Sequence, residues 1–222
     1  MHFEVPKAKT LKEFGGEYLM IVISILTALA LEHGVQALHH RTVAHEASEK
    51  IDAEIRENIK EIGIARQHNA TEAGNMQKIR DAIQADLLAG TDNDTLKKRI
   101  GTEYKDVFKI SMRTPSLRRE AWEVAVANQA VSWMPAEELK RYSSIYASMR
   151  DVQLIATTGG RSFLDGPRML DTMSNAQIGE VDPRETYRMV NQIISTYSSV
   201  NGNLGELQKL MEDTKSPAAA GH

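Results

Sequence analysis

The chain has 222 residues, a formal net charge of −3, 5% aromatic residues and no cysteine. The absence of cysteine excludes disulfides, thiolate catalysis and cysteine-based zinc sites. The slightly acidic balance and the few aromatic side chains argue against a nucleic acid partner, which needs a basic face and stacking platforms.

The first predicted element is a membrane-spanning helix over residues 18–38, after a short tail, 1–17. Residues 18–31 carry no charge, and the extension to Leu38 gives a helix of 21 residues. At 1.5 Å per residue this helix is about 31 Å long, which matches a hydrocarbon core of about 30 Å. Its apolar side chains contribute roughly −2.5 to −5 kcal/mol to insertion, which offsets the roughly 2.5–3.5 kcal/mol cost of Glu32.

A cleaved signal peptide is the alternative interpretation of the same residues. Lys7, Lys9 and Lys12 precede an apolar stretch of suitable length, and residues 28–30 (Ala-Leu-Ala) match a small-x-small cleavage site. On this alternative, the mature chain is an exported soluble helical protein. The spanning helix is favoured because an apolar residue follows the cleavage site and apolar character resumes at Val35.

The charges that flank the predicted span set its expected orientation. Three lysines precede the span within residues 1–17, whereas Arg41 and Lys50 follow it. Positively charged residues are enriched on the cytoplasmic side of a membrane. We therefore expect a cytoplasmic N-terminus and a C-terminal domain on the opposite side.

Two sets of small or polar residues in the predicted span are candidates for contact with another helix. Ser24, Ala28 and Glu32 recur every four residues and share one helix face, and Ala30 and Gly34 form a second small-xxx-small pair. Small side chains let helices approach closely in lipid, and a polar group can bridge them. The alternative is an ordinary anchor on which the Glu32 carboxylate reaches the membrane interface.

The helical domain is predicted to occupy residues 39–215 and to begin as a stalk. No proline lies between Val35 and Ile62, and no glycine either, so the anchor helix is expected to continue into the domain with little break. A stripe of isoleucines at helical spacing supports this helix: Ile51, Ile55, Ile59 and Ile62. A second helix, which carries Met76, is expected to end near Gly90.

Further helices are predicted in chain order. They cover 96–108 after a polar loop at 91–95, 117–131 after Thr114-Pro115-Ser116, 135–158 between Met134-Pro135 and Gly159-Gly160, and 183–215 after Asp182. Proline suits the first turn of a helix and glycine the residue after its end. A less regular stretch is expected at 161–181 and a flexible tail at 216–222. We therefore predict an all-α chain, in which a single N-terminal transmembrane helix is followed by an antiparallel helical bundle.

Residues 17–32 (Glu-Tyr-Leu-Met-Ile-Val-Ile-Ser-Ile-Leu-Thr-Ala-Leu-Ala-Leu-Glu) resemble the start of a large group of uncharacterised bacterial single-span membrane proteins. Residues 115–122, Met134-Pro135 and 142–146 are similar to the middle of the helical domain in that group. The resemblance implies a short N-terminal tail, one anchor helix and an all-helical C-terminal domain. It implies no catalytic residues. Together with the charge bias, it leads us to expect a single-pass protein of a bacterial inner membrane with a periplasmic domain.

A histidine-rich stretch follows the predicted span. It contains His33, His39, His40 and His45, with Glu46 and Glu49 beside them. His45 and Glu49 share a helix face, but no HExxH motif is present, and adjacent histidines point in different directions. We interpret the stretch as a polar collar at the membrane interface and predict no metal site.

Other candidate sites are weaker. Trp122 and Trp133 flank an apolar helix and are interpreted as core residues or as the lining of a groove for a ligand or partner. Residues 157–162 contain Gly-Gly but lack the lysine of a phosphate loop, which favours a helix end. Asn69 and Asn93 begin glycosylation sequons, a pattern short enough to occur by chance. No serine hydrolase framework is present, so we predict no catalytic residue and no cofactor.

These features favour a membrane-anchored helical module that self-associates or docks an envelope partner. The expected partners are the lipid bilayer and either a second copy of the chain or another membrane or envelope protein. A periplasmic helical bundle that senses a ligand and works through a partner is the alternative function.

Overall fold

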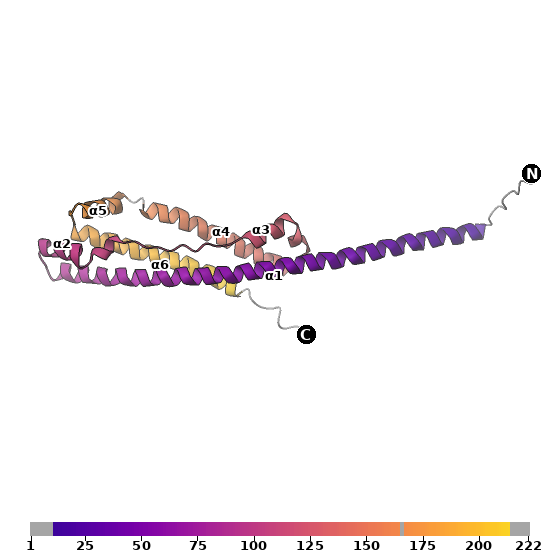
Figure 1. Cartoon of the computed structure of the whole chain (residues 1–222), viewed down its shortest axis with the longest axis horizontal. Helices are drawn as coiled ribbons and strands as arrows, with labels where there is room; N and C mark the ends of the chain where they lie inside the picture. Colours follow the sequence, from indigo (N-terminus) through magenta and orange to yellow (C-terminus); the bar gives the residue numbers. More distant parts are fainter. Residues whose placement is uncertain (1–10, 165–166, 214–222) are drawn as a thin grey trace, which may run out of the picture.

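The computed structural model describes residues 11–164 and 167–213 (Figure 1). Within these ranges the chain forms α-helices and two short 3-10 helices, with no strand, so the all-α prediction is confirmed. The α-helices are α1 (Leu11–Leu88), α2 (Asn93–Thr102), α3 (Glu120–Ala127), α4 (Ala136–Leu164), α5 (Pro167–Gln177) and α6 (Pro183–Asp213). The 3-10 helices are η1 (Lys105–Phe108) and η2 (Ala130–Trp133).

Helix α1 is a single rod of 78 residues. At 1.5 Å per residue it is about 117 Å long, and Figure 1 shows its N-terminal part projecting beyond the other helices. The expected stalk is confirmed, but the expectation of a separate second helix around Met76 is wrong. Gly63 and Gly74 lie inside α1, because an interior glycine costs only about 1 kcal/mol and packing on α6 offsets that cost. The helix stops before Gly90, whose φ of 71° is the left-handed conformation expected of a stop residue.

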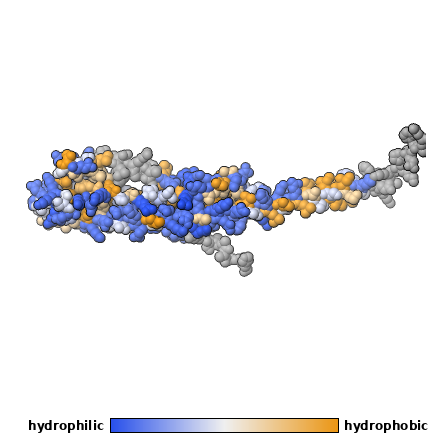
Figure 2. Space-filling view, viewed as in Figure 1, coloured by the Kyte–Doolittle hydropathy of each residue, from blue (hydrophilic) through white to orange (hydrophobic). Residues whose placement is uncertain are grey.

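Burial divides α1 into two parts. From residue 15 to residue 39 the side chains are exposed, except that Val22 is half-buried. Figure 2 shows the resulting hydrophobic surface on the projecting part of the rod. By length and composition, α1 is the one helix in the described chain that qualifies as a candidate membrane span, and its apolar window is not buried. The first buried residue is Ala44, where the packed domain begins.

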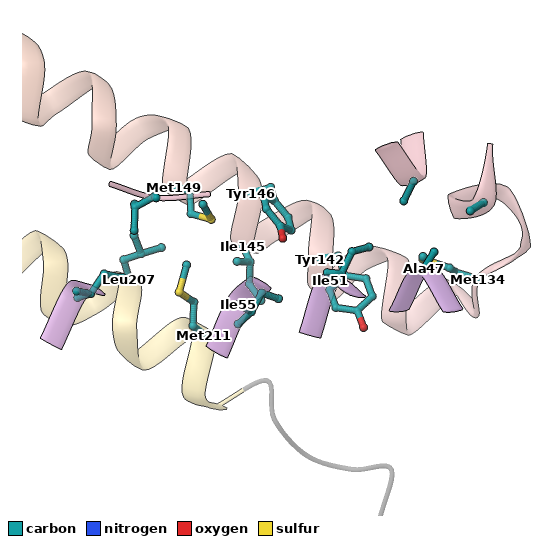
Figure 3. Packing of buried hydrophobic residues seen from close by; sticks show 14 of the residues in the cluster. Ala47, Ile51, Ile55, Met134, Tyr142, Ile145, Tyr146, Met149, Leu207 and Met211 are labelled. Atoms are coloured by element: carbon teal, nitrogen blue, oxygen red, sulfur yellow. The ribbon is translucent and has the colours of Figure 1, made fainter. Parts of the chain in front are cut away.

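The packed part is built on α1, α4 and α6. Ile51 and Ile55 of α1 share a hydrophobic cluster with Tyr142 of α4 and Met211 of α6 (Figure 3). Beyond it, two smaller clusters gather the end of α1, the start of α6 and the short elements α2 and η1. The end of α6 therefore lies beside the middle of α1, and the start of α6 lies beside the end of α1.

An extended segment, residues 109–119, crosses the domain along α1 (Figure 1). Two asparagines of α1 hold it. Asn69 Nδ2 donates to the carbonyl of Arg113 at 2.9 Å, and Asn69 Oδ1 accepts from the N–H of the same residue at 2.8 Å. Asn58 makes the same pair of hydrogen bonds with Arg118, at 2.9 and 2.8 Å. Each side-chain amide thus pairs with one residue of the segment as a neighbouring strand would.

We call each asparagine with its two hydrogen bonds a clamp. The spacing of the two clamps fits both α1 and the extended segment. The asparagines are eleven residues apart on a helix, which is about 16 Å at 1.5 Å per residue. Arg113 and Arg118 are five residues apart in extended chain, which also spans about 16 Å. The prediction of a helix opened by Thr114-Pro115-Ser116 is therefore wrong. In a helix over 117–131 the carbonyl of Arg118 would accept from the N–H of Trp122 instead of from Asn58, and α3 begins only at Glu120.

Several helix ends follow the local signals. Asp92 caps α2 by accepting from the N–H of Thr95 at 2.9 Å. Asp182 caps α6 by accepting from the N–H groups of Arg184 and Glu185, at 2.8 and 2.9 Å. The start of α6 after Asp182 is as predicted, whereas α2 begins at Asn93, inside the predicted polar loop and before the predicted start at residue 96. Asp before a helix satisfies its first free N–H groups.

Other predicted ends are wrong. Helix α2 stops at Thr102, and residues 105–108 form η1 instead of its last turn. Helix α4 continues through residues 159–160 to Leu164, because two interior glycines cost roughly 2 kcal/mol in a helix of 29 residues. The stretch expected to be irregular contains α5, with Pro167 in its first turn. The predicted tail, 216–222, lies outside the described residues.

Replacing Asn58 by alanine tests the clamp. The change removes the two hydrogen bonds that buried Asn58 makes with the backbone of Arg118, so we expect it to destabilise the fold by roughly 1–3 kcal/mol. For a domain of this size the melting temperature then falls by roughly 2–12 °C. The measurement is thermal unfolding of the full chain in detergent, followed by near-ultraviolet circular dichroism. Asn75→Ala, at an exposed position of the same helix, is the control and should change stability by less than about 0.7 kcal/mol. Equal effects of the two substitutions would contradict the clamp.

Candidate functional site

The candidate site is the exposed part of α1 together with the end of the helical domain beside it. The polar side chains in the exposed part have partners on the same helix. Ser24 Oγ donates to the carbonyl of Met20 at 2.8 Å, and Thr27 Oγ1 donates to that of Ile23 at 2.8 Å. Both hydroxyl donors are therefore satisfied within the preceding turn of α1.

Glu32 and His33 mark the end of the uncharged run and are paired in the same way. Glu32 Oε1 accepts from Gln36 Nε2 at 3.2 Å, and His33 Nδ1 lies 2.8 Å from the carbonyl of Leu29. Both residues are exposed. The carboxylate therefore has one donor from its own helix, which lowers but does not remove the cost of desolvating its charge.

The predicted contact residues lie on two different sides of α1. All five, Ser24, Ala28, Ala30, Glu32 and Gly34, are exposed. At about 100° per residue, Ser24 and Ala28 lie roughly 180° and 140° around the axis from Ile51, which faces the core. Ala30 lies only roughly 60° from that direction. The face with Ser24 and Ala28 thus points away from the helical domain, whereas Ala30 lies toward it.

The histidines of the predicted collar lie on different faces. His40 is half-buried and its ring stacks on Trp133, with centroids 3.6 Å apart and planes at 12°. The His39 ring lies 6.0 Å from His40 at a tilted angle, and exposed His45 lies 3.5 Å from Glu49. Within residues 11–164 and 167–213, no three histidine, aspartate or glutamate side chains come together as a metal site.

The two tryptophans lie in different surroundings. Trp122 on α3 is partly buried and stacks on Tyr146, with ring centroids 5.2 Å apart and planes at 10°. Trp133 is 50% exposed and lies against α1 at His40. The structure therefore does not bring the two rings together.

A hollow with a volume of about 760 Å³ lies between α1 and α3. Neither tryptophan lines it. Its walls combine small apolar side chains with charges of both signs: Val43, Glu46, Ala47, Lys50, Ala53, Glu54, Arg56, Glu57, Arg118, Glu120, Ala121, Val124, Ala125 and Asn128. It is an open groove of mixed charge, with no cluster of one sign that selects a particular ion.

A buried carboxylate links α1, α3 and α4 beside this hollow. Glu54 is 8% exposed, its Oε2 accepts from the N–H of Ala121 at 2.8 Å, and its Oε1 accepts from the Tyr146 hydroxyl at 2.5 Å. Burial, and then the hydrogen bond to Glu54, raise the pKa of Tyr146 above its ordinary value. These contacts fix the start of α3 against α1.

The polar anchors of α1 were missed in the sequence, although a signal exists. Glu54, Asn58 and Asn69 recur in the helical phase of the buried residues Ile51 and Ile62. A polar side chain within an apolar stripe is buried with the stripe, and a buried polar group needs a partner. Their positions in the helical repeat are therefore enough to predict that all three side chains are buried and hydrogen-bonded inside the fold.

The remaining sequence candidates have structural explanations. The side-chain amide of Asn69, which begins the first sequon, is fully buried and donates to the carbonyl of Arg113. It is therefore not accessible for glycosylation in the folded chain. Asn93 is exposed at the start of α2. Residues 157–162 lie within helix α4, so neither a phosphate loop nor a helix end occurs there, and their side chains lie outside the described residues.

No family model, curated protein or solved structure matches this chain significantly. The resemblance of residues 17–32 and 115–122 to bacterial single-span proteins therefore stays a prediction. Function is inferred from the exposed apolar surface of α1 and from the end of the helical domain beside it.

Replacing Tyr146 by phenylalanine tests the buried carboxylate link through pH. An unfolded tyrosine loses its proton near pH 10, whereas the folded state holds it to higher pH. The stability that Tyr146 contributes is thus present below about pH 10 and falls above it by about 1.4 kcal/mol per pH unit. We expect melting temperatures between pH 9 and pH 11 to fall less steeply in Tyr146→Phe than in the wild type. Identical slopes would contradict the link.

Proposed function

We propose that this chain is a membrane-anchored helical module, with residues 18–38 as a single span and the rest as an antiparallel helical bundle. One observation carries the proposal. The first part of α1 presents a continuous apolar surface to its surroundings, and the same helix then enters a packed core at Ala44. An exposed apolar surface of this extent is unfavourable in water and is typical of contact with a membrane or a partner.

The exposed large apolar residues fill the predicted span from end to end. They are Tyr18, Leu19, Met20, Ile21, Ile23, Ile25, Leu26, Leu29, Leu31, Val35 and Leu38. They lie on all sides of the helix, as expected where lipid surrounds it. A helix that docks on one soluble partner has an apolar stripe instead.

The span passes into the domain without a flexible joint. Ala44 follows Leu38 by six residues, which is about 9 Å of helix. On this proposal the domain begins at the membrane surface, and the polar residues 39–42 lie at the headgroups. With the basic residues before the span in the cytoplasm, the domain is periplasmic in a bacterial inner membrane.

We further propose that the module self-associates through the face of the span that carries Ser24 and Ala28. This face points away from the helical domain, so two copies can meet there while their domains project outward. The Ser24 hydroxyl is bonded within its own helix, so it acts as a small side chain that allows close approach. Ala30 lies toward the side of α1 that carries the domain, where a second copy has less room, and Gly34 lies roughly 100° from that side.

A ligand-sensing bundle is the second candidate, and the hollow between α1 and α3 favours it. Its volume of about 760 Å³ lies within the range typical of small-molecule sites. Such a sensor would act through a partner, and the rigid α1 would connect the hollow to the span.

Alkaline extraction of cell membranes tests the anchor. We expect the full chain, with a C-terminal reporter that is active only in the periplasm, to stay in the pellet with an active reporter. An integral span resists alkali because its apolar surface stays in the bilayer. Release into the soluble fraction with a shortened N-terminus would support the cleaved signal peptide instead. A pelleted chain with an inactive reporter would reverse the orientation.

Cysteine crosslinking tests the self-association face, since the chain has no native cysteine. We expect Ala28→Cys to form disulfide-linked dimers in membranes under mild oxidation, because the two copies of this face meet. Leu26→Cys is the matched control at nearly the same depth. It lies about 200° around the helix from Ala28 and about 20° from the direction of Ile51. Equal crosslinking at both positions, or none at either, would contradict the proposed face.

A further inference from the structure

The end of the helical domain nearest the span is an uncharged corner. We define the proximal corner as residues 124–136, which run from α3 through η2 to the start of α4 (Figure 1). No charged residue occurs in these thirteen positions, although 26% of the chain is charged. Val124, Val126 and Trp133 are large apolar side chains of this corner, and they are 59%, 46% and 50% exposed.

Contacts with α1 show the direction in which this corner points. The N–H of Ala121, near the start of α3, donates to Glu54, whereas Asn128, just after α3, lines the hollow whose wall extends along α1 to Val43. Helix α3 therefore runs along α1 toward the proposed span. Of these residues, Trp133 contacts α1 at the position nearest the proposed span, because its ring stacks on His40. Helix α4 then runs back along α1, away from the proposed span, and the hydroxyl of its Tyr142 donates to Asp52 Oδ1 at 3.0 Å.

The level of Trp133 relative to the bilayer follows from its contact with His40. His40 is two residues after Leu38, which is about 3 Å of helix beyond the end of the proposed span. The polar headgroup layer on each side of the hydrocarbon core is roughly 5–8 Å thick. A side chain stacked on His40 therefore lies within that layer.

We propose that the proximal corner rests in the headgroup layer of the bilayer that holds α1, with Trp133 as its interfacial anchor. This rests on the proposed function, in which residues 18–38 span the membrane. Tryptophan is enriched at membrane interfaces, because its large ring is apolar and its N–H is a hydrogen-bond donor. The absence of charge in the corner lowers the cost of placing its surface against lipid.

The corner is held firmly enough to act as a second point of contact. Ala130 and Met134 on either side of the exposed turn are buried against the core that contains Ala44. Trp133 is fixed between them by its stack on His40. A span alone allows the domain to tilt in any direction. A second, rigid contact at the interface sets one side of the domain toward the membrane, so the domain keeps a defined orientation.

Tryptophan fluorescence tests this proposal, since the chain has two tryptophans. Trp122→Phe leaves Trp133 as the reporter, and Trp133→Phe leaves Trp122, which stacks on Tyr146 in the domain. The full-length variants are reconstituted into phosphatidylcholine vesicles whose acyl chains are brominated close to the headgroups. We expect the emission of Trp133 to fall in brominated vesicles and to resist iodide in the water. The emission of Trp122 should be unchanged by the brominated lipid.

Three other results would overturn the proposal. Quenching of Trp133 by iodide and not by brominated lipid would place the corner in water. Protection from both quenchers would mean that a second copy or another protein covers it. A chain that vesicles release in alkali would show that the proposed function itself has failed, whereas a retained chain with unquenched Trp133 would reject only the corner contact.

A second measurement leaves both tryptophans in place. An environment-sensitive fluorophore is attached at Ser132→Cys in the proximal corner or at Ser144→Cys on α4, both exposed positions. We expect the label at residue 132 to brighten on reconstitution into vesicles and the label at residue 144 to stay unchanged. Equal behaviour of the two labels would overturn the proposal.

Discussion

The fold depends on the hydrogen bonds by which Asn58 and Asn69 hold an extended segment along α1. They pair with the backbone N–H and carbonyl groups of Arg113 and Arg118 and hold that backbone extended. Residues 109–119 therefore cross the domain in extended form and carry the chain back toward the proposed span. Without that path, α3 would not start beside Glu54, and Trp133 would not reach His40. The position of the proximal corner is a consequence of these two amides.

Helix α1 presents two kinds of surface on one continuous backbone. Its first part has an apolar surface on all sides, whereas its later part has a buried stripe and charged outer faces. No loop separates them, so a rotation or tilt of the first part is passed directly to the core. Such coupling is what the proposed membrane-anchored module requires, since its domain is to keep a fixed position relative to the span. The stiffness comes from unbroken helical hydrogen bonding along α1.

Buried polar groups, and not hydrophobic contact alone, decide which elements lie beside α1. The clusters around Ile51 and Ile62 would accept many apolar partners, because hydrophobic packing has little directional preference. Glu54 accepts only correctly placed donors, which are the N–H of Ala121 and the Tyr146 hydroxyl. A mispaired arrangement would leave a buried carboxylate without donors, at a high cost in free energy.

The sequence by itself determined the features that depend on neighbouring residues. These include the all-helical class, the apolar run at 18–31, the stop at Gly90 and the start of the last helix after Asp182. Such signals act within one or two helical turns, so they can be read along the chain. The tertiary structure decided the extended course of residues 109–119, since its partners are 44 and 60 residues away. It also decided that Trp122 and Trp133 lie apart, because long-range pairing with α1, and not local propensity, places α3 and η2.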